Sequence, residues 1–193
     1  PCMDDDDIRR GKPTNHKVFG EPVAVLAGDA LLTLAFEIVG KSNPNHRYDV
    51  GDMVKELAIT SGSKHLVGGQ VLDIEGENAT IGPKALRFIH ESKTAALLTC
   101  SLKLGAMSAA ATPKKIEALT NFGHSTGLAF QIIDDILDVT QTSEKLGKSA
   151  GKDEAVNKST YPAIYGLRKS RNEAAKLTKT AINSLKIFGK SGT

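Results

Sequence analysis

Apolar residues recur at every third or fourth position over most of this chain, which is the spacing of helices that pack through one face. The stretches with this spacing are residues 22–38, 50–61, 64–74, 84–110, 113–123 and 125–140, with a last one opened by Pro162. Pro22 and Pro113 stand where proline is favoured, in the first turn of a helix. No run of alternating β-branched residues is long enough to build a sheet. The pattern therefore predicts an all-α fold, with residues 1–193 forming a single domain.

Polar segments rich in Gly, Pro or Asn separate the helical stretches and predict loops. Residues 9–17 form a basic segment that directly follows an acidic one, and residues 43–45 make the next break. Residues 76–83 form a connector, and residues 141–159 form a long polar segment rich in Lys and Gly. We therefore expect short connectors between the helices, except for one long loop after residue 140.

The composition fits a helical protein and narrows the range of partners. Of the 193 residues, 40% are hydrophobic but only 5% are aromatic, a composition more typical of helices than of sheets. The net charge of +3 is too small to indicate a nucleic-acid partner. No apolar run reaches membrane-spanning length and no signal peptide is visible, so we expect no stable membrane insertion. Cys2 and Cys100 indicate incidental thiols in a reducing compartment, with a single disulfide as the alternative.

A cluster of carboxylates lies inside an otherwise apolar helical stretch. At helical spacing Asp134, Asp135 and Asp138 fall on one side, with Gln131 one turn earlier. Carboxylates held this close would repel one another and lose hydration unless a cation bound between them. The alternative is an exposed acidic patch, which the flanking Ile and Leu residues disfavour. The cluster predicts a Mg²⁺ site that completes its coordination with water and substrate phosphates.

A second acidic run opens the chain. Residues 4–7 are four aspartates, and Asp4 begins the run that leads into Arg9 and Arg10. Taken alone, the run reads equally well as a solvated acidic tail. Carboxylates that hold a metal, placed beside guanidinium groups, are also what a diphosphate requires. The adjacent acid and base therefore suggest a bound polyanion.

Three lysines are candidates for phosphate contacts. Lys148 and Lys158 lie in the long polar loop after the acidic helix, where neighbouring glycines allow the backbone to approach a ligand. Lys93, followed by Thr94, stands in an otherwise apolar helical stretch. The alternative for each lysine is an ordinary surface or snorkelling side chain. The nearby acidic cluster favours the phosphate interpretation for the loop lysines.

Taken together, these segments resemble the trans-prenyltransferases, the short-chain isoprenyl diphosphate synthases, and within them the geranylgeranyl diphosphate synthases of plastid and bacterial type. The likeness spans essentially the whole chain. It is carried by residues 3–16, 27–32, 69–73, 93–95, 130–138 and 151–153. The resemblance implies an all-helical bundle around a deep cavity, with two aspartate-rich motifs facing each other across its mouth. It also implies homodimers, or a heteromer with a related subunit.

By this resemblance Asp134, Asp135 and Asp138 form the second motif, and Asp4 matches the last aspartate of the first motif. The leading aspartate pair of the first motif would lie before Pro1. We therefore expect the chain to lack the N-terminal helices of the family and its final helix. We further expect this polypeptide alone to have little or no activity.

The resemblance implies a reaction without a side-chain nucleophile. Mg²⁺ ions, three per complete site, bind an allylic diphosphate between the two motifs and polarise its leaving group. The double bond of isopentenyl diphosphate attacks the resulting allylic cation, and a proton is lost. The contacts that the resemblance implies are Arg9 with the allylic diphosphate, Arg10 with isopentenyl diphosphate, Lys93, Lys148 and Lys158 with the leaving diphosphate, and Thr94, Gln131, Gln70 and Asp73 near the reacting carbons or metals.

Two other interpretations compete with a prenyl diphosphate synthase. A class I terpene cyclase would need Asn, Ser and Glu at spacings of four; Asn121 and Ser125 fit, but Ala129 replaces the Glu. A non-catalytic or regulatory subunit of a heteromeric synthase is the second alternative, although the complete 134–138 motif argues against it. The motifs do not define product length. The resemblance places the protein in a plastid if its source is photosynthetic and eukaryotic, and in the cytoplasm if it is bacterial.

Overall fold

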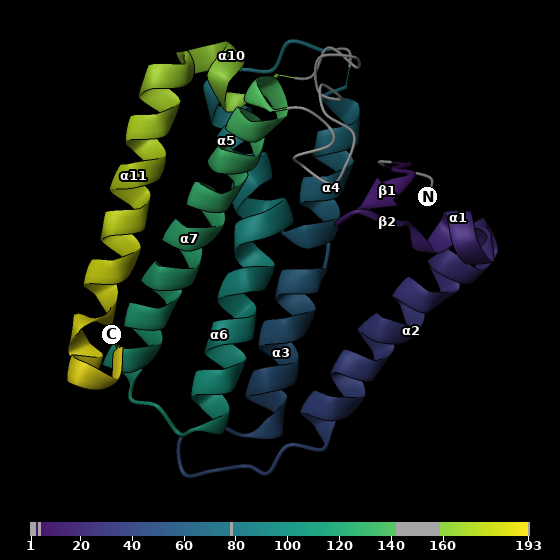
Figure 1. The fold of residues 1–193 in the computed structure, drawn as a ribbon. Coiled ribbons are helices and arrows are strands. Elements are labelled where there is room, and N and C mark those ends of the chain that lie inside the picture. Colours follow the sequence, from purple (N-terminus) through teal and green to yellow (C-terminus); the bar gives the residue numbers. More distant parts are fainter. Residues whose placement is uncertain (1–2, 4, 78, 142–158, 193) are drawn as a thin grey trace.

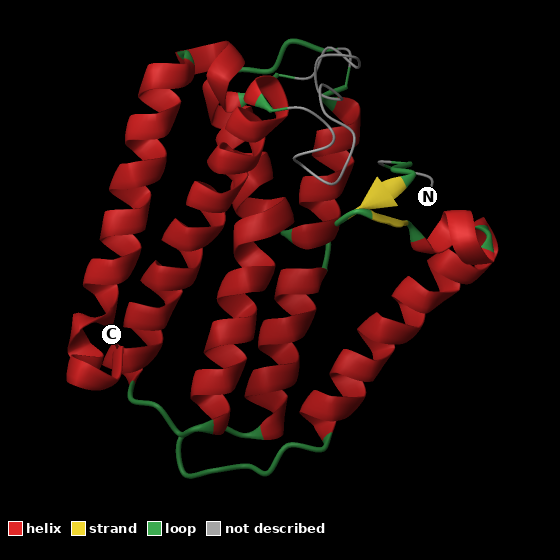
Figure 2. Ribbon diagram, viewed as in Figure 1, coloured by secondary structure: helices red, strands yellow, loops and turns green. Residues whose placement is uncertain are grey.

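The computed structural model of this protein describes residues 3, 5–77, 79–141 and 159–192. Within them, helices stand side by side and one small hairpin of strands lies near the N-terminus (Figures 1 and 2). The elements are β1 (Ile8–Arg9), β2 (Lys12–Pro13), α1 (Asn15–Phe19), α2 (Glu21–Gly40), α3 (Val50–Ser61), α4 (Leu66–Glu75), α5 (Pro83–Ile89), η1 (His90–Ala95), α6 (Ala96–Ser108), α7 (Pro113–Thr140), α10 (Tyr161–Tyr165), α11 (Leu167–Ser184) and η2 (Leu185–Gly192). The all-α prediction is confirmed.

The bundle is ordered by its helix contacts. Helix α7 packs between α11 on one side and α6 on the other, and α6 in turn packs against α3 (Figure 1). Ile132 and Ile136 of α7 form a buried cluster with Ala174 of α11. Cys100 of α6 is a buried free thiol, and burial raises its pKa, so it contributes to packing rather than to reactivity.

The N-terminal segment is more ordered than the predicted loop over residues 9–17. Ile8 pairs with Pro13 and Arg9 with Lys12 in an antiparallel hairpin. Its two turn residues, Arg10 and Gly11, have φ of 54° and 73°. Positive φ at both positions is the signature of a two-residue turn whose twist matches its strands. The loop prediction was wrong here because Gly11 permits this tight turn, which lets the chain pair with itself.

The predicted helix over 84–110 is interrupted in its middle. Residues His90–Ala95 form a π-helical segment, η1, between the α-helices α5 and α6. The segment is held closely from two sides. A Cβ added to Gly69 of α4 would stand 2.5 Å from the backbone nitrogen of Lys93. A Cβ added to Gly127 of α7 would stand 2.4 Å from the Cα of Ala95. Only glycine allows both neighbours to come this close to η1.

The two stretches predicted over 113–123 and 125–140 are one helix, α7, which runs through Pro113–Thr140. Gly123 and Ser125, which marked the division in the sequence, are both buried against neighbouring helices. Tertiary packing overrides the low helix propensity of glycine at this position. A continuous α7 carries the acidic cluster on the same rigid element as Gly127.

Helix α2 stands apart from the rest at an angle, in contact with α1 and α3 (Figure 1). None of its residues is buried, and Leu26, Leu31 and Ile38 are more than 60% exposed. By length and composition it is the one helix among the described residues that could cross a membrane. The sequence analysis missed this. The indication is weak, because packed helices of bundles pass the same test and Asp29 lies in the middle of α2.

Candidate active site

The C-terminal half of α7 presents two carboxylates that fit a metal ion. Asp134 is half-buried, and Asp138 is only 7% exposed, with its Oδ2 lacking a hydrogen-bond partner among the described residues. A buried carboxylate oxygen without a partner is costly unless a cation or donor meets it. In the described part of the chain no three His, Cys, Asp or Glu side chains converge as a ready-made metal site. Two carboxylates nevertheless suit Mg²⁺, which completes its shell with water and phosphate oxygens.

Asp135 differs from the other two carboxylates in its contacts. Its Oδ2 accepts a hydrogen bond of 2.8 Å from the backbone N–H of Tyr161 and lies 3.6 Å from His90 Nε2. Both side chains of the His90–Asp135 pair are 6% exposed. Helical spacing had placed Asp135 in one set with Asp134 and Asp138, but the structure has its carboxylate already engaged by η1 and α10.

Lys93 is held by a partner that sequence reasoning named only as a minor site residue. Its Nζ donates a 2.6 Å hydrogen bond to Asp73 Oδ2, and the Asp73 side chain is 6% exposed. The Lys93 side chain is 26% exposed, so it is partly accessible to solvent. The ion pair joins α4 to η1 at the contact that Gly69 allows. Gln70, one turn before Asp73, is half-buried.

Thr94 and Gln131 meet directly. The Thr94 hydroxyl donates a 2.8 Å hydrogen bond to Gln131 Oε1, which joins η1 to α7. Lys93 and Thr94 are consecutive residues of the π-helical segment, and each bonds to a different neighbouring helix. The segment therefore fixes both side chains within one turn of the chain.

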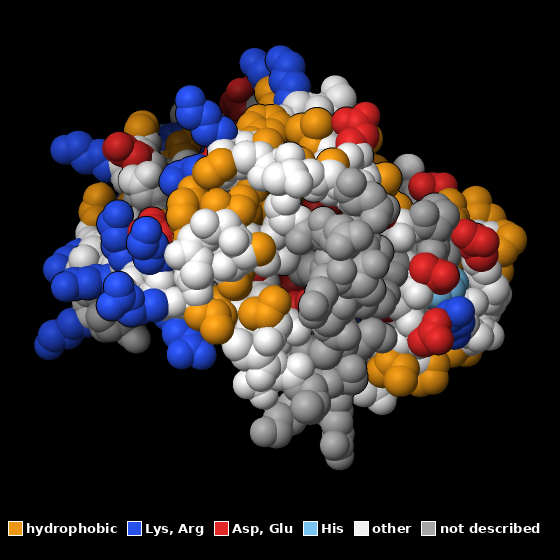
Figure 3. Space-filling model, turned by 90° about the horizontal axis from the view of Figure 1, so that it is seen from above, with side chains coloured by type: hydrophobic (Ala, Val, Ile, Leu, Met, Phe, Trp, Pro, Cys, Tyr) orange, Lys and Arg blue, Asp and Glu red, His pale blue; other side chains and the backbone are white. Residues whose placement is uncertain are grey.

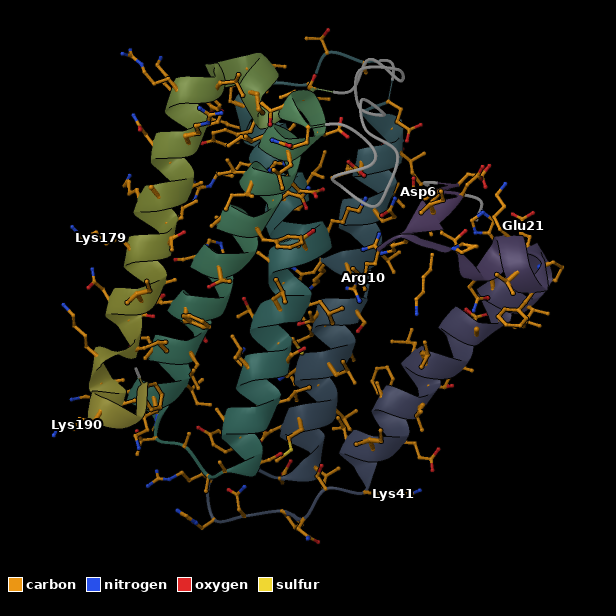
Figure 4. The ribbon with its side chains drawn as sticks, in the orientation of Figure 1. Asp6, Arg10, Glu21, Lys41, Lys179 and Lys190 are labelled. Carbon is orange, nitrogen blue, oxygen red and sulfur yellow. The ribbon has the colours of Figure 1, made fainter. Side chains whose placement is uncertain are left out.

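The N-terminal hairpin carries the predicted diphosphate-binding arginines. Arg9 and Arg10 are both exposed, and Figure 4 shows Arg10 at the turn of the hairpin and Asp6 on the segment before its first strand. Two carboxylates of the acidic run contact side chains of α1. Asp5 Oδ1 lies 3.0 Å from His16 Nε2, and Asp7 Oδ1 lies 2.8 Å from Lys17 Nζ. The Asp7 carboxylate raises the pKa of Lys17 through a hydrogen bond.

Three predicted site residues, Asp4, Lys148 and Lys158, lie outside the described residues. His90 and Tyr161 are contacts that the sequence analysis missed. The available signal for His90 was a polar residue three positions before Lys93 in an apolar stretch, whereas nothing in the sequence pointed to the Tyr161 amide. Helix α11 also carries exposed cations, namely Arg168, Lys169, Arg171, Lys176 and Lys179, and Figure 3 shows Lys and Arg side chains at the left of the molecule.

Several curated proteins are similar to this chain over almost all of its length. The chain is 51% identical over 190 residues to a chloroplastic geranylgeranyl pyrophosphate synthase of Capsicum annuum, covering 97% of this chain and 52% of that protein. It is also 51% identical over 194 residues to an Arabidopsis thaliana protein named heterodimeric geranylgeranyl pyrophosphate synthase large subunit 1. The alignment there covers 97% of this chain and 52% of the relative. The chain thus spans about half the length of the curated relatives that it matches.

Solved structures give the same result. A geranyltransferase of Helicobacter pylori, in complex with magnesium and isoprenyl diphosphate, superposes with a TM-score of 0.84 at 35% identity. That superposition covers 99% of this chain and 62% of the other. A synthase from Zymomonas mobilis, named an FPP/GFPP synthase, gives a TM-score of 0.82 at 35% identity, covering 100% and 64%. The family model described as polyprenyl synthetase matches residues 2–187, and the chain belongs to that family.

Proposed function

We propose that this chain takes part in a Mg²⁺-dependent prenyl transfer that joins isopentenyl diphosphate to an allylic diphosphate, as in geranylgeranyl diphosphate synthesis. The observation that supports it most is the buried Oδ2 of Asp138, which has no hydrogen-bond partner among the described residues and lies on the helix that also carries Asp134. The related Helicobacter pylori structure, which holds magnesium and isoprenyl diphosphate, supports the same assignment.

Asp134 and Asp138 would hold Mg²⁺ on this side of the site, with Asp4 facing them as the resemblance implies. Bound there, Mg²⁺ supplies charge that stabilises the departing diphosphate. Asp135 is left out of this set, because its Oδ2 already accepts a hydrogen bond from the Tyr161 N–H. Because α7 is a continuous helix, we expect the Asp134 and Asp138 carboxylates to lose little conformational freedom when the metal binds.

The other side chains would bind and align the substrates. Asp73 orients Lys93 so that its ammonium group can donate further hydrogen bonds to a diphosphate. Lys148 and Lys158 would add charge to the same leaving group, and Arg9 and Arg10 would bind the two substrate diphosphates as planar donors. Thr94 and Gln131, bonded to each other, would line the site near the reacting carbons.

The assembly and location that we propose follow the relatives. A second copy of this chain or a related subunit would cover the apolar side chains of α2, since apolar areas this extended usually mark an interface. The relative named as a heterodimeric large subunit makes a heteromer a specific alternative. A plastid location is supported by the chloroplastic relatives.

The direct test combines turnover with binding. The chain is incubated with Mg²⁺, labelled isopentenyl diphosphate and an allylic primer, and apolar product is counted after dephosphorylation. In parallel, a non-ionisable allylic diphosphate analogue is titrated calorimetrically with Mg²⁺ or with EDTA. We expect Mg²⁺-dependent binding that Asp134→Asn weakens and that Glu37→Gln, on the remote helix α2, leaves unchanged.

The outcomes separate the candidate functions. Product formation supports the synthase itself. Binding without product, followed by altered product when an active relative is added, supports the subunit role. Absence of both product and Mg²⁺-dependent binding would overturn the proposal.

A further inference from the structure

One stripe of α7 faces the helix that contains η1. Residues 123, 127, 131 and 135 are each four positions apart, so they lie along one side of α7. The residues that they contact on the other helix follow in descending sequence order. Gly123 faces Thr99, Gly127 faces Ala95, Gln131 bonds to Thr94, and Asp135 lies beside His90. By its place in this series, Asp135 belongs to the helix contact rather than to an open ligand site.

The hydrogen bonding of Asp135 agrees with that placement. The residue is 5% exposed, and its Oδ2 is within reach of both a backbone donor on α10 and an imidazole on η1. Asp138 is buried to a similar extent, yet its Oδ2 has no hydrogen-bond partner in the described residues. Two carboxylates three positions apart thus differ: one oxygen accepts a hydrogen bond from the protein, and the other has no partner among the described residues.

Two of the three elements that Asp135 joins, α7 and η1, carry predicted substrate contacts. His90 begins the π-helical turn that holds Lys93 and Thr94. Tyr161 begins α10, directly after the segment containing Lys158. The Thr160 side chain also accepts a 3.3 Å hydrogen bond from the Ala163 N–H. Two side chains, those of Asp135 and Thr160, therefore accept hydrogen bonds from backbone N–H groups at the start of α10.

We propose that Asp135 is a positioning residue, which fixes η1 and the start of α10 against α7 through His90 and the Tyr161 N–H, and is not a metal ligand. This assignment rests on the proposed function for its catalytic consequence, but its structural part stands alone. It distinguishes Asp135 from Asp134 and Asp138 within one acidic motif.

The structural part is tested by amide hydrogen exchange on the 193-residue chain. Asparagine keeps a carbonyl oxygen that can accept the Tyr161 N–H, whereas alanine does not. We expect Asp135→Ala to speed exchange at Tyr161 at least tenfold and Asp135→Asn to speed it less than threefold. Exchange at Leu57, in the core of α3, serves as the control for global destabilisation. Equal exchange at Tyr161 in the wild type and Asp135→Ala would overturn the proposal.

The ligand part is tested with Mn²⁺ as the probe, followed by electron paramagnetic resonance in the presence of inorganic diphosphate. We expect Asp134→Asn to weaken Mn²⁺ binding at least tenfold, Asp135→Asn less than threefold, and Asp135→Ala by an intermediate factor. Equal weakening by the two asparagine variants would make Asp135 a ligand and overturn the assignment. If the wild type binds no Mn²⁺, the proposed function fails, and the exchange result alone decides the role of Asp135.

Discussion

The chain has two acidic clusters that are built in opposite ways. Asp5 and Asp7 stand exposed on the N-terminal segment, beside His16 and Lys17 of the helix that follows. Asp135 and Asp138 project from a long helix and are 5% and 7% exposed. The carboxyl group is the same in both places, but water and nearby cations stabilise it at the hairpin, whereas α7 withdraws it from water.

The contrast shows that the exposure of a carboxylate determines whether it needs a partner from elsewhere in the fold. An exposed ion pair contributes little and is formed by sequence neighbours. A buried carboxylate requires a partner brought by tertiary structure or by a ligand. Substitutions in the α7 cluster should therefore have large effects, and substitutions in the hairpin cluster small ones.

The largest effect is expected from Asp134→Asn. In a full-length version that carries both aspartate-rich motifs, loss of a metal-holding carboxylate should lower the rate of prenyl transfer by about a hundredfold or more, because stabilisation of the leaving group fails. Asp7→Asn should lower that rate less than about tenfold, since an exposed pair is lost. Steady-state rates with labelled isopentenyl diphosphate measure both. Similar losses in the two variants would contradict the distinction between the clusters.

A smaller effect is expected where α7 packs on η1. Gly127→Ala would place a Cβ 2.4 Å from the Ala95 Cα, and such overpacking costs about 1–3 kcal/mol of unfolding free energy. Gly105→Ala in α6 is the matched control, because an added Cβ there meets nothing within 4 Å. It should stabilise the protein by about 0.5–1 kcal/mol through backbone entropy. Urea denaturation gives both values, and a tolerated Gly127→Ala would show that this contact is loose.

The smallest effect concerns the hairpin ion pair. The folded-state pKa of Lys17 is raised above its ordinary 10.5, mainly by the hydrogen bond to Asp7. The contribution of this pair to stability is therefore complete below about pH 10.5 and is lost as the pH rises through the raised value. Asp7→Asn should return the pKa of Lys17 towards 10.5, which an NMR titration of the Lys17 side chain would detect. An unchanged titration would mean that Asp7 does not hold Lys17 in solution.

Much of the fold could be predicted from hydrophobic spacing. The stretch 50–61 coincides with α3, and the stretch 22–38 lies within α2, because each has a clear helical period and a capping or proline signal at its start. The hairpin turn at Arg10 and the π-helical segment could not be predicted. The turn depends on the positive φ that Gly11 adopts, and the π-helical segment depends on the close approach that Gly69 permits.

The sequence pattern groups residues of the candidate site but does not give the contacts between them. Helical spacing is sufficient to group Asp134 with Asp138, because both lie on one helix. It could not separate Asp135 from them, since the separation depends on an amide of α10, which is distant in sequence. The partner of Lys93 was similarly hidden, because Asp73 comes from a different helix.

The π-helical segment constrains the number of residues that can connect α5 to α6. A π turn holds an extra residue compared with an α turn, so η1 sets the rotational phase between α5 and α6. Deleting one residue from His90–Ala95 would favour a regular α-helix and leave the rotational phase between α5 and α6 nearly unchanged, because a π turn needs one residue more for the same rotation. Leu86 and Ile89 before the segment, and Cys100 after it, would then stay buried, whereas the side chains inside the segment would shift. The number of residues between two helices is thus itself a determinant of where Lys93 and Thr94 lie.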